Sequence, residues 1–416
     1  MKVLLSAYWC EPGKGSEVGI GWNIAWQVAR FHDAWVLTQR DGRQGIEAAL
    51  ASEALAKVRV VYLDLPRWAQ FLRERRWGCQ FHYYVWQLAS YFVGWRLHRK
   101  VGFDLVHHVT LGKYWMPSFL ALLPVPFLWG PVGGGESAPP AFWWSFSLRG
   151  KISELARDLA RKIGEHDPFV RRTARKAALA LATTEESAKR MRMLGCGRVS
   201  VLSNVGLAQD EIRRLSSMPL YHGGPFRLIS VGRLLHWKGY HLSVRAFAEF
   251  HRQFPESEYW LIGDGPERTR LRKLAQRLGV AESLTIWGVI PRWQVLEKLA
   301  ECDVLIHPSL HDSGGWACLE AMAAGRPVVC LDLGGPGLQV TEKTGIKVRA
   351  STPDEAVTDL AKAILRLAED PELRVRMGEA SRQRVKERFG WVSKVDFMGI
   401  YEMTVGALER KHANVP

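Results

Sequence analysis

The chain has 416 residues, 47% hydrophobic and 24% charged, a balance typical of a folded globular protein and not of a disordered one. This length exceeds one ordinary hydrophobic core, so we expect two domains of about 200 residues each. Lys and Arg outnumber Asp and Glu by 57 to 42, and the net charge of +15 favours anionic partners such as diphosphates, acidic lipids or nucleic acid.

The cysteines and the apolar runs indicate a cytoplasmic location. The six cysteines form no Cys-x-x-Cys pair, which favours reduced, mostly buried thiols. The apolar run after Met1 is too short for an export signal, and no stretch reaches the roughly 18 apolar residues that a membrane-spanning helix needs.

The N-terminal third alternates predicted strands and helices, the opening of a doubly wound α/β domain. A strand at 2–8 precedes a glycine-rich loop at 11–21 and a helix at 22–31. The alternation continues with a strand at 34–38, a helix at 44–56 and a strand at 58–63. The loop glycines do not fit the Gly-x-Gly-x-x-Gly spacing, so a nicotinamide cofactor is not expected.

Residues 66–100 form a basic and aromatic segment. Its seven cations, against one acid, are Arg67, Arg73, Arg75, Arg76, Arg96, Arg99 and Lys100. They flank an aromatic centre at 81–95, a pattern that suits the surface of an anionic membrane. The alternative is a helix that packs its aromatic rings onto the first domain. Twelve of the 18 Trp residues precede residue 150, which suits stacking on sugars or contact with lipid in this half.

Two further strands of this half carry candidate site residues. A strand at 104–110 contains His107 and His108, of which one would face a ligand or both would be structural. The strand that begins at Phe127 is followed by a glycine loop and Glu136.

A basic helical region at 149–176, broken near Asp167, leads to a strand at 179–184, a helix at 185–194 and a strand at 199–205. The Pro- and Gly-rich residues 216–225 are the best linker, which gives an N-terminal domain of 1–215.

The alternation resumes in a second domain at 226–390, followed by an amphipathic stretch at 391–416. Its central stretch runs from His307 to Pro327, where a buried strand at 302–306 gives way to a loop and then to a helix. Gly314 and Gly315 lie where the helix begins, so free N–H groups there suit a phosphate. Asp312 and Glu320 stand eight positions apart and could face one pocket.

Four motifs of this half, in order, resemble family 4 glycosyltransferases, retaining enzymes of the two-domain GT-B fold. Ser230 to Gly239 resembles the family's phosphate loop, 261–266 its second turn, and 287–289 the segment that cradles the nucleotide base. The stretch around Asp312 resembles its Glu-x7-Glu motif, with Asp in place of the first Glu. Many family members also have a histidine after the strand at 127–129, where this chain has Gly130, so its role is left open to Glu136, His107 or His108.

The resemblance implies roles for particular residues. A UDP- or GDP-sugar would be the donor, and the cytoplasmic membrane face would supply a lipid-linked or polysaccharide acceptor. The implied catalytic residues are Arg233, Lys238, Asp312, His107 and His108. The implied donor-binding residues are Gly232, Gly263, Trp287, Gly288, Val289, Gly314, Gly315, Trp316, Ala317 and Glu320. Loops that would seat the acceptor contain Gly13, Gly15, Ser16, Glu17, Gly133, Gly134 and Glu136. The final helix would cross back onto the first domain.

The chemistry of such a site needs two negative charges neutralised on the departing diphosphate. The chain contains no Asp-x-Asp motif for a divalent metal, so we expect no metal and no cofactor. Arg233 and Lys238, five residues apart after a strand, would take that role, with Glu320 on the ribose and Asp312 on the donor sugar.

Other functions are compatible with parts of the sequence. A nucleic-acid-binding protein would explain the charge, but no nucleic-acid module is visible. A nucleotide-sugar epimerase of the same fold would share the donor site but would leave the basic, Trp-rich half unexplained. A non-catalytic scaffold would be expected to lack Arg233, Lys238 or Glu320.

Overall fold

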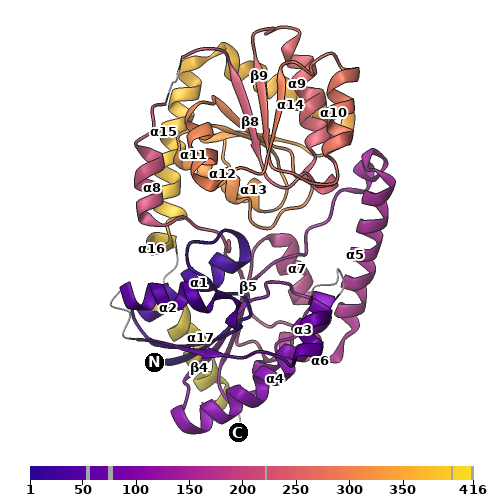
Figure 1. The fold of residues 1–416 in the computed structure, drawn as a ribbon. Helices are drawn as coiled ribbons and strands as arrows, with labels where there is room; N and C mark the ends of the chain where they lie inside the picture. The colour runs from indigo at the N-terminus through magenta and orange to yellow at the C-terminus, as the bar shows by residue number, and fades with distance from the viewer. Residues whose placement is uncertain (53–56, 74–77, 221–222, 395–396, 414–416) are drawn as a thin grey trace. The chain divides into compact units, whose positions relative to one another are not determined.

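The computed structural model of the chain describes residues 1–52, 57–73, 78–220, 223–394 and 397–413. They form two compact units: unit 1 is 1–135, 157–204 and 395–416, and unit 2 is 136–156 and 205–394. Each unit contains one parallel sheet with helices packed on it (Figure 1). The predicted α/β class with two doubly wound domains is therefore confirmed.

The units divide the chain differently from the predicted N-terminal domain, linker, second domain and C-terminal helix. Residues 136–156 and 205–215 belong to unit 2. The second of these segments contains most of α8 (Gln209–Ser216), which contacts helices α12 and α15 of unit 2. Residues 221 and 222 of the predicted linker lie outside the described residues.

Unit 1 has a seven-stranded sheet in the order β3-β2-β1-β4-β5-β6-β7. The strands are β1 (Lys2–Ala7), β2 (Asp33–Thr38), β3 (Val58–Tyr62), β4 (Leu105–Thr110), β5 (Phe127–Val132), β6 (Leu179–Ala182) and β7 (Val199–Val201). The helices are α1 (Ser16–Ala29), α2 (Arg43–Ser52), α3 (Arg67–Arg73), α4 (Gly78–Val101), α6 (Pro168–Lys176), α7 (Glu185–Met193) and α17 (Phe397–Ala413). Helix α5 (Leu148–His166) has its first part in unit 2 and its second in unit 1.

Helix α1 begins at Ser16, six residues before the predicted start at Trp22. Two of the glycines that indicated a loop, Gly19 and Gly21, lie inside the helix, where the backbone of the preceding loop approaches it. A β carbon at Gly19 would lie 1.9 Å from the carbonyl oxygen of Lys14, and one at Gly21 would lie 2.1 Å from that of Trp9. These glycines therefore serve close packing of the helix, and the loop before it is shorter than predicted.

The two faces of the unit 1 sheet pack on different helices because side chains alternate along each strand. Val106 and Trp129 point to the face covered by α4, in a core that includes Tyr83 and Trp86. His107, the neighbour of Val106, points to the opposite face and meets Tyr401 of α17. The C-terminal helix is thus part of unit 1.

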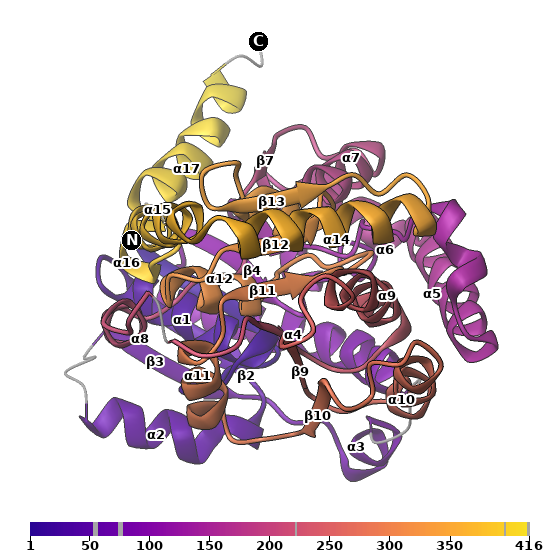
Figure 2. The same ribbon diagram turned by 90° about the horizontal axis from the view of Figure 1, so that it is seen from above.

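Unit 2 has a six-stranded sheet in the order β10-β9-β8-β11-β12-β13. The strands are β8 (Arg227–Val231), β9 (Glu258–Ile262), β10 (Leu284–Gly288), β11 (Val304–His307), β12 (Val328–Leu331) and β13 (Gly345–Val348). The other helices are α9 (Tyr240–His251), α10 (Arg268–Arg277), α11 (Arg292–Ala300), α12 (Trp316–Ala323), α13 (Gly334–Gln339), α14 (Pro353–Glu369), α15 (Pro371–Arg388) and α16 (Trp391–Lys394). Figure 2 shows α9, α10 and α14 on one face of this sheet and α8, α11 and α12 on the other.

The basic and aromatic segment at 66–100 forms α3 and α4, with Arg75 and Arg76 outside the described residues. One face of α4 is buried on the sheet, as the packing alternative expected. Its other face is exposed and carries Phe81, Leu88, Phe92 and Trp95. Among the described residues, no helix combines the length and the apolar character that crossing a membrane requires.

Candidate active site

The sheet of unit 2 brings the four sequence motifs to one edge. Strands β8 and β11 are neighbours, and their following loops meet where the N–H of Leu310 donates to the carbonyl oxygen of Trp237 at 2.8 Å. Strands β9 and β10 extend the edge, and the N–H of Gly263 donates to the carbonyl oxygen of Gly288 at 2.8 Å. These are carboxyl ends of parallel strands, the usual place for a ligand in such sheets.

Gly263 allows the first two of these loops to touch. Its φ is +137°, which a residue with a side chain rarely adopts, and a β carbon would lie 2.0 Å from the carbonyl oxygen of Gly232. The phosphate-loop backbone after β8 therefore packs directly on the second conserved turn after β9.

The two predicted diphosphate cations have different surroundings. Arg233 is exposed, and within the described residues its guanidinium makes neither a hydrogen bond nor an ion pair. Lys238 is half-buried and donates from its ammonium to Asp312 Oδ2. The sequence placed both residues in one loop, and the structure shows that only Lys238 is already paired with a carboxylate.

Asp312 is held on both of its carboxylate oxygens. Oδ2 also accepts from His307 Nε2 at 3.2 Å, while Oδ1 accepts from the N–H groups of Gly314 at 3.2 Å and Gly315 at 3.3 Å. Burial alone would raise the pKa of this carboxyl, but the Lys238 charge and the His307 hydrogen bond hold the pKa well below its usual range. Asp312 is thus a fixed anion at the start of α12.

Glu320 lies in α12 and is 4% exposed. Its Oε1 is 2.6 Å from Arg292 Nη2, in an ion pair without hydrogen-bond geometry, and the same guanidinium donates to Glu211. Burial raises the pKa of Glu320 to about 7 in spite of the Arg292 charge, and the Glu211 charge adds to the increase. Neither Arg292 nor Glu211 carried a motif that would have singled it out.

The predicted base-binding segment combines a supported aromatic ring with an exposed residue. Trp287 is 39% exposed and packs edge-on against Trp260, with ring centroids 5.6 Å apart. Lys298 Nζ lies 4.8 Å from the centroid of Trp287, and Val289 is 83% exposed. Gly288 between them is buried. The indole of Trp287 is therefore held in place and still partly open to a ligand.

The first turn of α12 carries the predicted phosphate-binding N–H groups. Gly315 is its N-cap, with φ +68°, and Trp316 and Ala317 follow it. The indole N–H of Trp316 is buried and has no hydrogen-bond partner in the described part of the chain. Gln339 Nε2 donates to the carbonyl oxygen of Gly314. This end of α12 thus offers backbone and indole donors to an anion.

Glu154 of α5, which the sequence reading did not single out, joins two of these loops within unit 2. Its buried Oε1 accepts from His236 Nε2 at 2.9 Å and from His311 Nε2 at 3.1 Å. Trp237 stacks on the His311 ring, with centroids 5.3 Å apart. One carboxylate thus fixes the phosphate loop against the loop that carries Asp312. Its only sequence signal is an acid on the polar face of a helix.

The two predicted histidines of unit 1 are both buried on β4, against the expectation of a ring that faces a ligand. His107 Nε2 donates to the carbonyl oxygen of Gly130 at 2.5 Å, so its Nδ1 accepts from Tyr401 Oη at 2.8 Å. Burial lowers the pKa of His107 to about 3 and that of His108 to about 4. Both imidazoles are neutral at pH 7, and His107 connects β4 to β5 and α17.

Position 130 has no room for the family's histidine. A β carbon at Gly130 would lie 2.2 Å from the carbonyl oxygen of Leu181 on the neighbouring strand β6. In this chain position 130 of β5 therefore requires glycine.

The glycine loops of unit 1 lie at the carboxyl ends of β1, β4 and β5. Glu17 in the first turn of α1 accepts from the N–H of Gly112 after β4, and burial raises the pKa of Glu17. Lys113 pairs with Gly133 after β5. These contacts join the loops that contain Gly13, Gly15, Ser16, Gly133 and Gly134 along one edge. Glu136 is buried and falls in unit 2.

Comparison with known proteins agrees with the family resemblance of the four sequence motifs. Residues 219–384 match the family model described as glycosyl transferases group 1, which confirms the predicted resemblance. A 2-deoxystreptamine glucosyltransferase of Streptomyces kanamyceticus is 30% identical over 44% of this chain and 47% of its own. A lipopolysaccharide core biosynthesis glycosyltransferase, LpsD of Rhizobium meliloti, is 28% identical over 50% of this chain and 58% of its own. The chain spans about half the length of the curated relatives it matches.

Among solved structures, the Anabaena protein HepE in complex with UDP and glucose matches with a TM-score of 0.60. It is 18% identical, and the match covers 100% of both chains. A likeness at this identity shows the fold, which is the predicted GT-B fold.

Proposed function

We propose that this chain, whose residues 219–384 match the glycosyl transferases group 1 family, is a retaining hexosyltransferase that uses a UDP- or GDP-sugar. The observation that carries the proposal is the edge of unit 2. There the exposed Arg233 follows β8, Lys238 of the same loop pairs with Asp312, and the donor N–H groups lie at the start of α12. Cations and helix N–H groups beside an aromatic ring suit a nucleotide diphosphate.

The proposed reaction needs no metal, because protein cations stabilise the leaving group. The bond between the anomeric carbon and the diphosphate oxygen breaks, and that oxygen keeps the electron pair. Arg233 and the α12 N–H groups stabilise its negative charge. The acceptor hydroxyl oxygen bonds to the anomeric carbon on the same face, and its proton passes to the departing diphosphate oxygen.

The pairing of Lys238 with Asp312 refines the roles of the two cations. An ammonium next to a carboxylate contributes little net charge, so Arg233 supplies most of the local positive charge. The Lys238 ammonium has three N–H donors, of which one goes to Asp312 and the others can bind a phosphate oxygen. The same contact holds the Asp312 carboxylate in place to accept from a hydroxyl of the donor sugar. Glu320, next to Arg292, is placed to accept from the ribose hydroxyls.

The proposed acceptor is a cell-envelope glycan or glycolipid at the cytoplasmic face of the membrane. LpsD of Rhizobium meliloti, a relative by sequence, is a lipopolysaccharide core biosynthesis glycosyltransferase. The exposed face of α4, with Phe92 and Trp95 beside Arg96 and Arg99, supports contact with an anionic membrane surface.

Nucleotide titration tests the donor site. UDP or GDP should bind more tightly than the matching nucleoside, and Arg233→Ala should remove most of that difference, because one charge-assisted contact is lost. Arg277→Ala, an exposed arginine in the last turn of α10, is the matched control and should leave both affinities unchanged.

Transfer of labelled sugar from the bound donor to membrane-derived acceptors then tests the reaction. Lys238→Ala should slow transfer by on the order of a hundredfold, as for the loss of one transition-state donor. Retention of nucleic acid without any nucleotide-sugar binding would favour the nucleic-acid alternative instead.

A further inference from the structure

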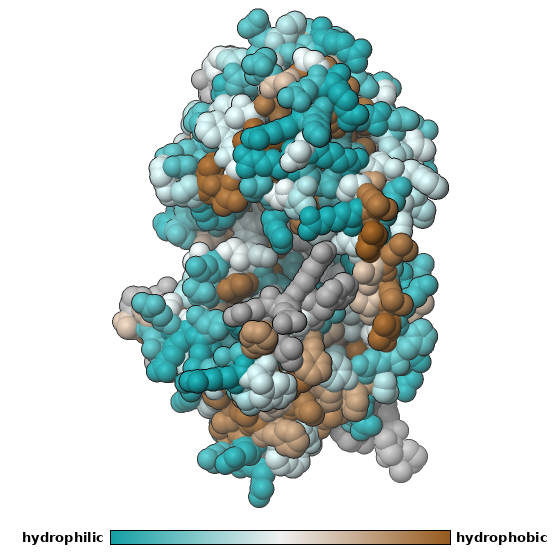
Figure 3. Space-filling model, turned by 45° about the vertical axis from the view of Figure 1, so that its right-hand side comes forward, coloured by the Kyte–Doolittle hydropathy of each residue, from teal (hydrophilic) through white to brown (hydrophobic). Residues whose placement is uncertain are grey.

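Helix α5 is amphipathic, but its apolar face is exposed and its opposite face is buried, the reverse of an ordinary surface helix. Five apolar residues at spacings of three and four share one face, and each is between 59% and 74% exposed: Leu148, Ile152, Leu155, Leu159 and Ile163. Small and charged residues on the opposite face are buried: Gly150, Glu154, Arg161 and Gly164. A surface helix normally buries its apolar stripe. Figure 3 shows the stripe of α5 as a brown strip.

The second part of α5, in unit 1, is fixed with its apolar face outward. A β carbon at Gly164 would lie 2.4 Å from the carbonyl oxygen of Trp115, so this face cannot accept a larger side chain. Glu165 accepts from Tyr114 Oη at 2.5 Å and pairs with Arg190 at 3.2 Å. These contacts prevent the helix from rotating to bury Leu159 and Ile163.

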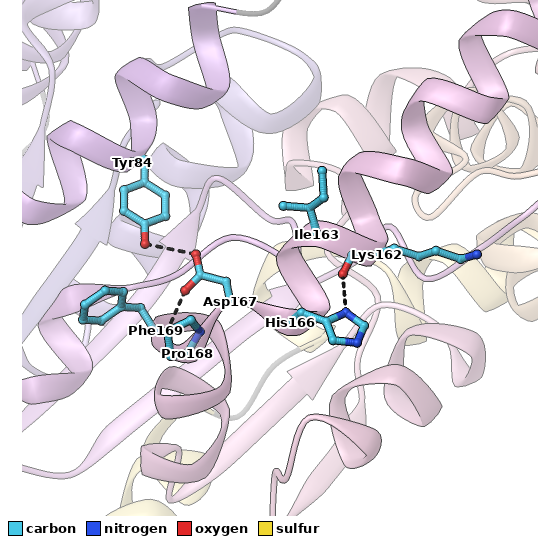
Figure 4. Close-up of a pocket in the computed structure, with 7 residues that line it drawn as sticks. All are labelled: Tyr84, Lys162, Ile163, His166, Asp167, Pro168 and Phe169. Atoms are coloured by element: carbon cyan, nitrogen blue, oxygen red, sulfur yellow. Dashed lines mark hydrogen bonds between the residues drawn. The ribbon is translucent and has the colours of Figure 1, made fainter.

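The apolar face leads into a hollow between α4, α5 and α6. Tyr84, Ile163, Pro168 and Phe169 supply its apolar lining, and its volume is about 570 Å³ (Figure 4). Its one carboxylate is already used, because Asp167 accepts from Tyr84 Oη at 3.0 Å and from the N–H of Phe169 at 2.7 Å. The hollow therefore offers apolar surface without a free negative charge.

A basic hollow adjoins the apolar one and shares Pro168 and Phe169 with it. Its remaining lining is Arg172, Arg175 and Lys176 of α6, a helix with four cations and no acid. In the part of the chain that the structure describes, none of these three side chains forms an ion pair. In the 66–100 segment, Arg73 pairs with Asp41 at 2.6 Å, whereas Arg96, Arg99 and Lys100 at the end of α4 form no ion pair with a described residue.

We propose that the α5–α6 face, defined by Leu159, Ile163, Phe169 and the three α6 cations, docks on an anionic lipid bilayer. The apolar side chains enter the boundary between headgroups and acyl chains, and the α6 cations contact lipid phosphates. The apolar hollow suits the acyl chains of a lipid, and the adjoining basic hollow suits its phosphate headgroup. The residues of this surface belong to unit 1 and the donor residues to unit 2, and the proposal does not depend on the proposed transfer reaction.

Vesicle binding of the full chain tests the proposal. Binding to vesicles of phosphatidylcholine with phosphatidylglycerol should greatly exceed binding to phosphatidylcholine alone. Changing Arg172, Arg175 and Lys176 together to Gln should weaken it by on the order of a hundredfold, since each cation near an anionic leaflet contributes about fivefold. The double variant Leu159→Ser, Ile163→Ser should remove the part of binding that high salt leaves. Lys189→Gln with Met193→Ser on α7, both exposed, is the matched control and should bind normally.

The outcomes separate the possible occupants of this face. Wild-type binding in the α6 triple variant or in the Leu159→Ser, Ile163→Ser variant would overturn the proposal, as would equal binding to neutral and anionic vesicles. If the wild-type chain self-associates in sedimentation and the double variant is monomeric without any change in vesicle binding, the face is a contact between copies. Loss of nucleotide affinity in either variant would show a folding defect, and circular dichroism with nucleotide titration checks for it. If Arg96, Arg99 and Lys100 changed to Gln abolish binding while the α6 variant binds normally, α4 and not α5–α6 is the lipid contact.

Discussion

Replacing Glu320 by Gln should stabilise unit 2 at neutral and alkaline pH while it weakens donor binding. Glu320 and Glu211 share the single guanidinium of Arg292, so one buried carboxylate is only partly compensated. Burial raises the pKa of Glu320 from its ordinary value of 4.5 to about 7, because the opposing effect of the Arg292 charge is smaller and the Glu211 charge adds to the increase.

The magnitude and the pH range follow from proton binding. The folded chain keeps the Glu320 proton up to pH of about 7, whereas the unfolded chain loses it near 4.5. Between these values the folded state binds more protons, so the stability of the wild type falls as pH rises through this window and is constant above it. The difference of about 2.5 in pKa corresponds to on the order of 3 kcal/mol. Gln at this position carries no charge at any pH and avoids the loss.

Urea unfolding at pH 4.5 and pH 8, followed by tryptophan fluorescence, measures the effect. The advantage of Glu320→Gln over the wild type should be larger at pH 8 by on the order of 3 kcal/mol. Glu372→Gln, whose side chain is 89% exposed, is the control and should show no such pH dependence. The UDP or GDP affinity of Glu320→Gln should fall if the carboxylate accepts from the ribose. A variant that is less stable than the wild type at pH 8 would refute the reasoning, because the ion pair with Arg292 would then outweigh the cost of burial.

Three further results are expected. Asp312→Asn should lower transfer more than Asp312→Glu, because only the second keeps the charge that pairs with Lys238; equal, full activity in both would make Asp312 structural. Tyr401→Phe should destabilise unit 1 by about 1–2 kcal/mol, because a buried acceptor on His107 loses its donor, and should leave donor affinity unchanged in titration. Transfer should persist in excess EDTA, and complete loss that magnesium or manganese restores would contradict the fixed-cation chemistry.

Much of the fold was predictable from the sequence. The alternation of apolar strands with helices predicted the α/β class, and the strand at 58–62 and the helix at 185–193 match their predicted ranges closely. The start of α1 was predicted too late because glycines were interpreted as a loop. At Gly19 and Gly21 they instead make room for a backbone that packs against the helix. Local pattern does not distinguish these two uses of glycine.

The sequence by itself determined which chemical groups follow which strands: the Arg233 to Lys238 loop, the Asp312 to Glu320 stretch and the basic helices of the N-terminal half. Only the tertiary structure decided what each group meets. Lys238 and Asp312 are 74 residues apart and become partners because β8 and β11 are neighbours in the sheet. The stripe of α5 has the same period whether it is buried or exposed. Its direction is set by which face the rest of the chain can contact, and here only the face of Gly150 and Gly164 allows close packing.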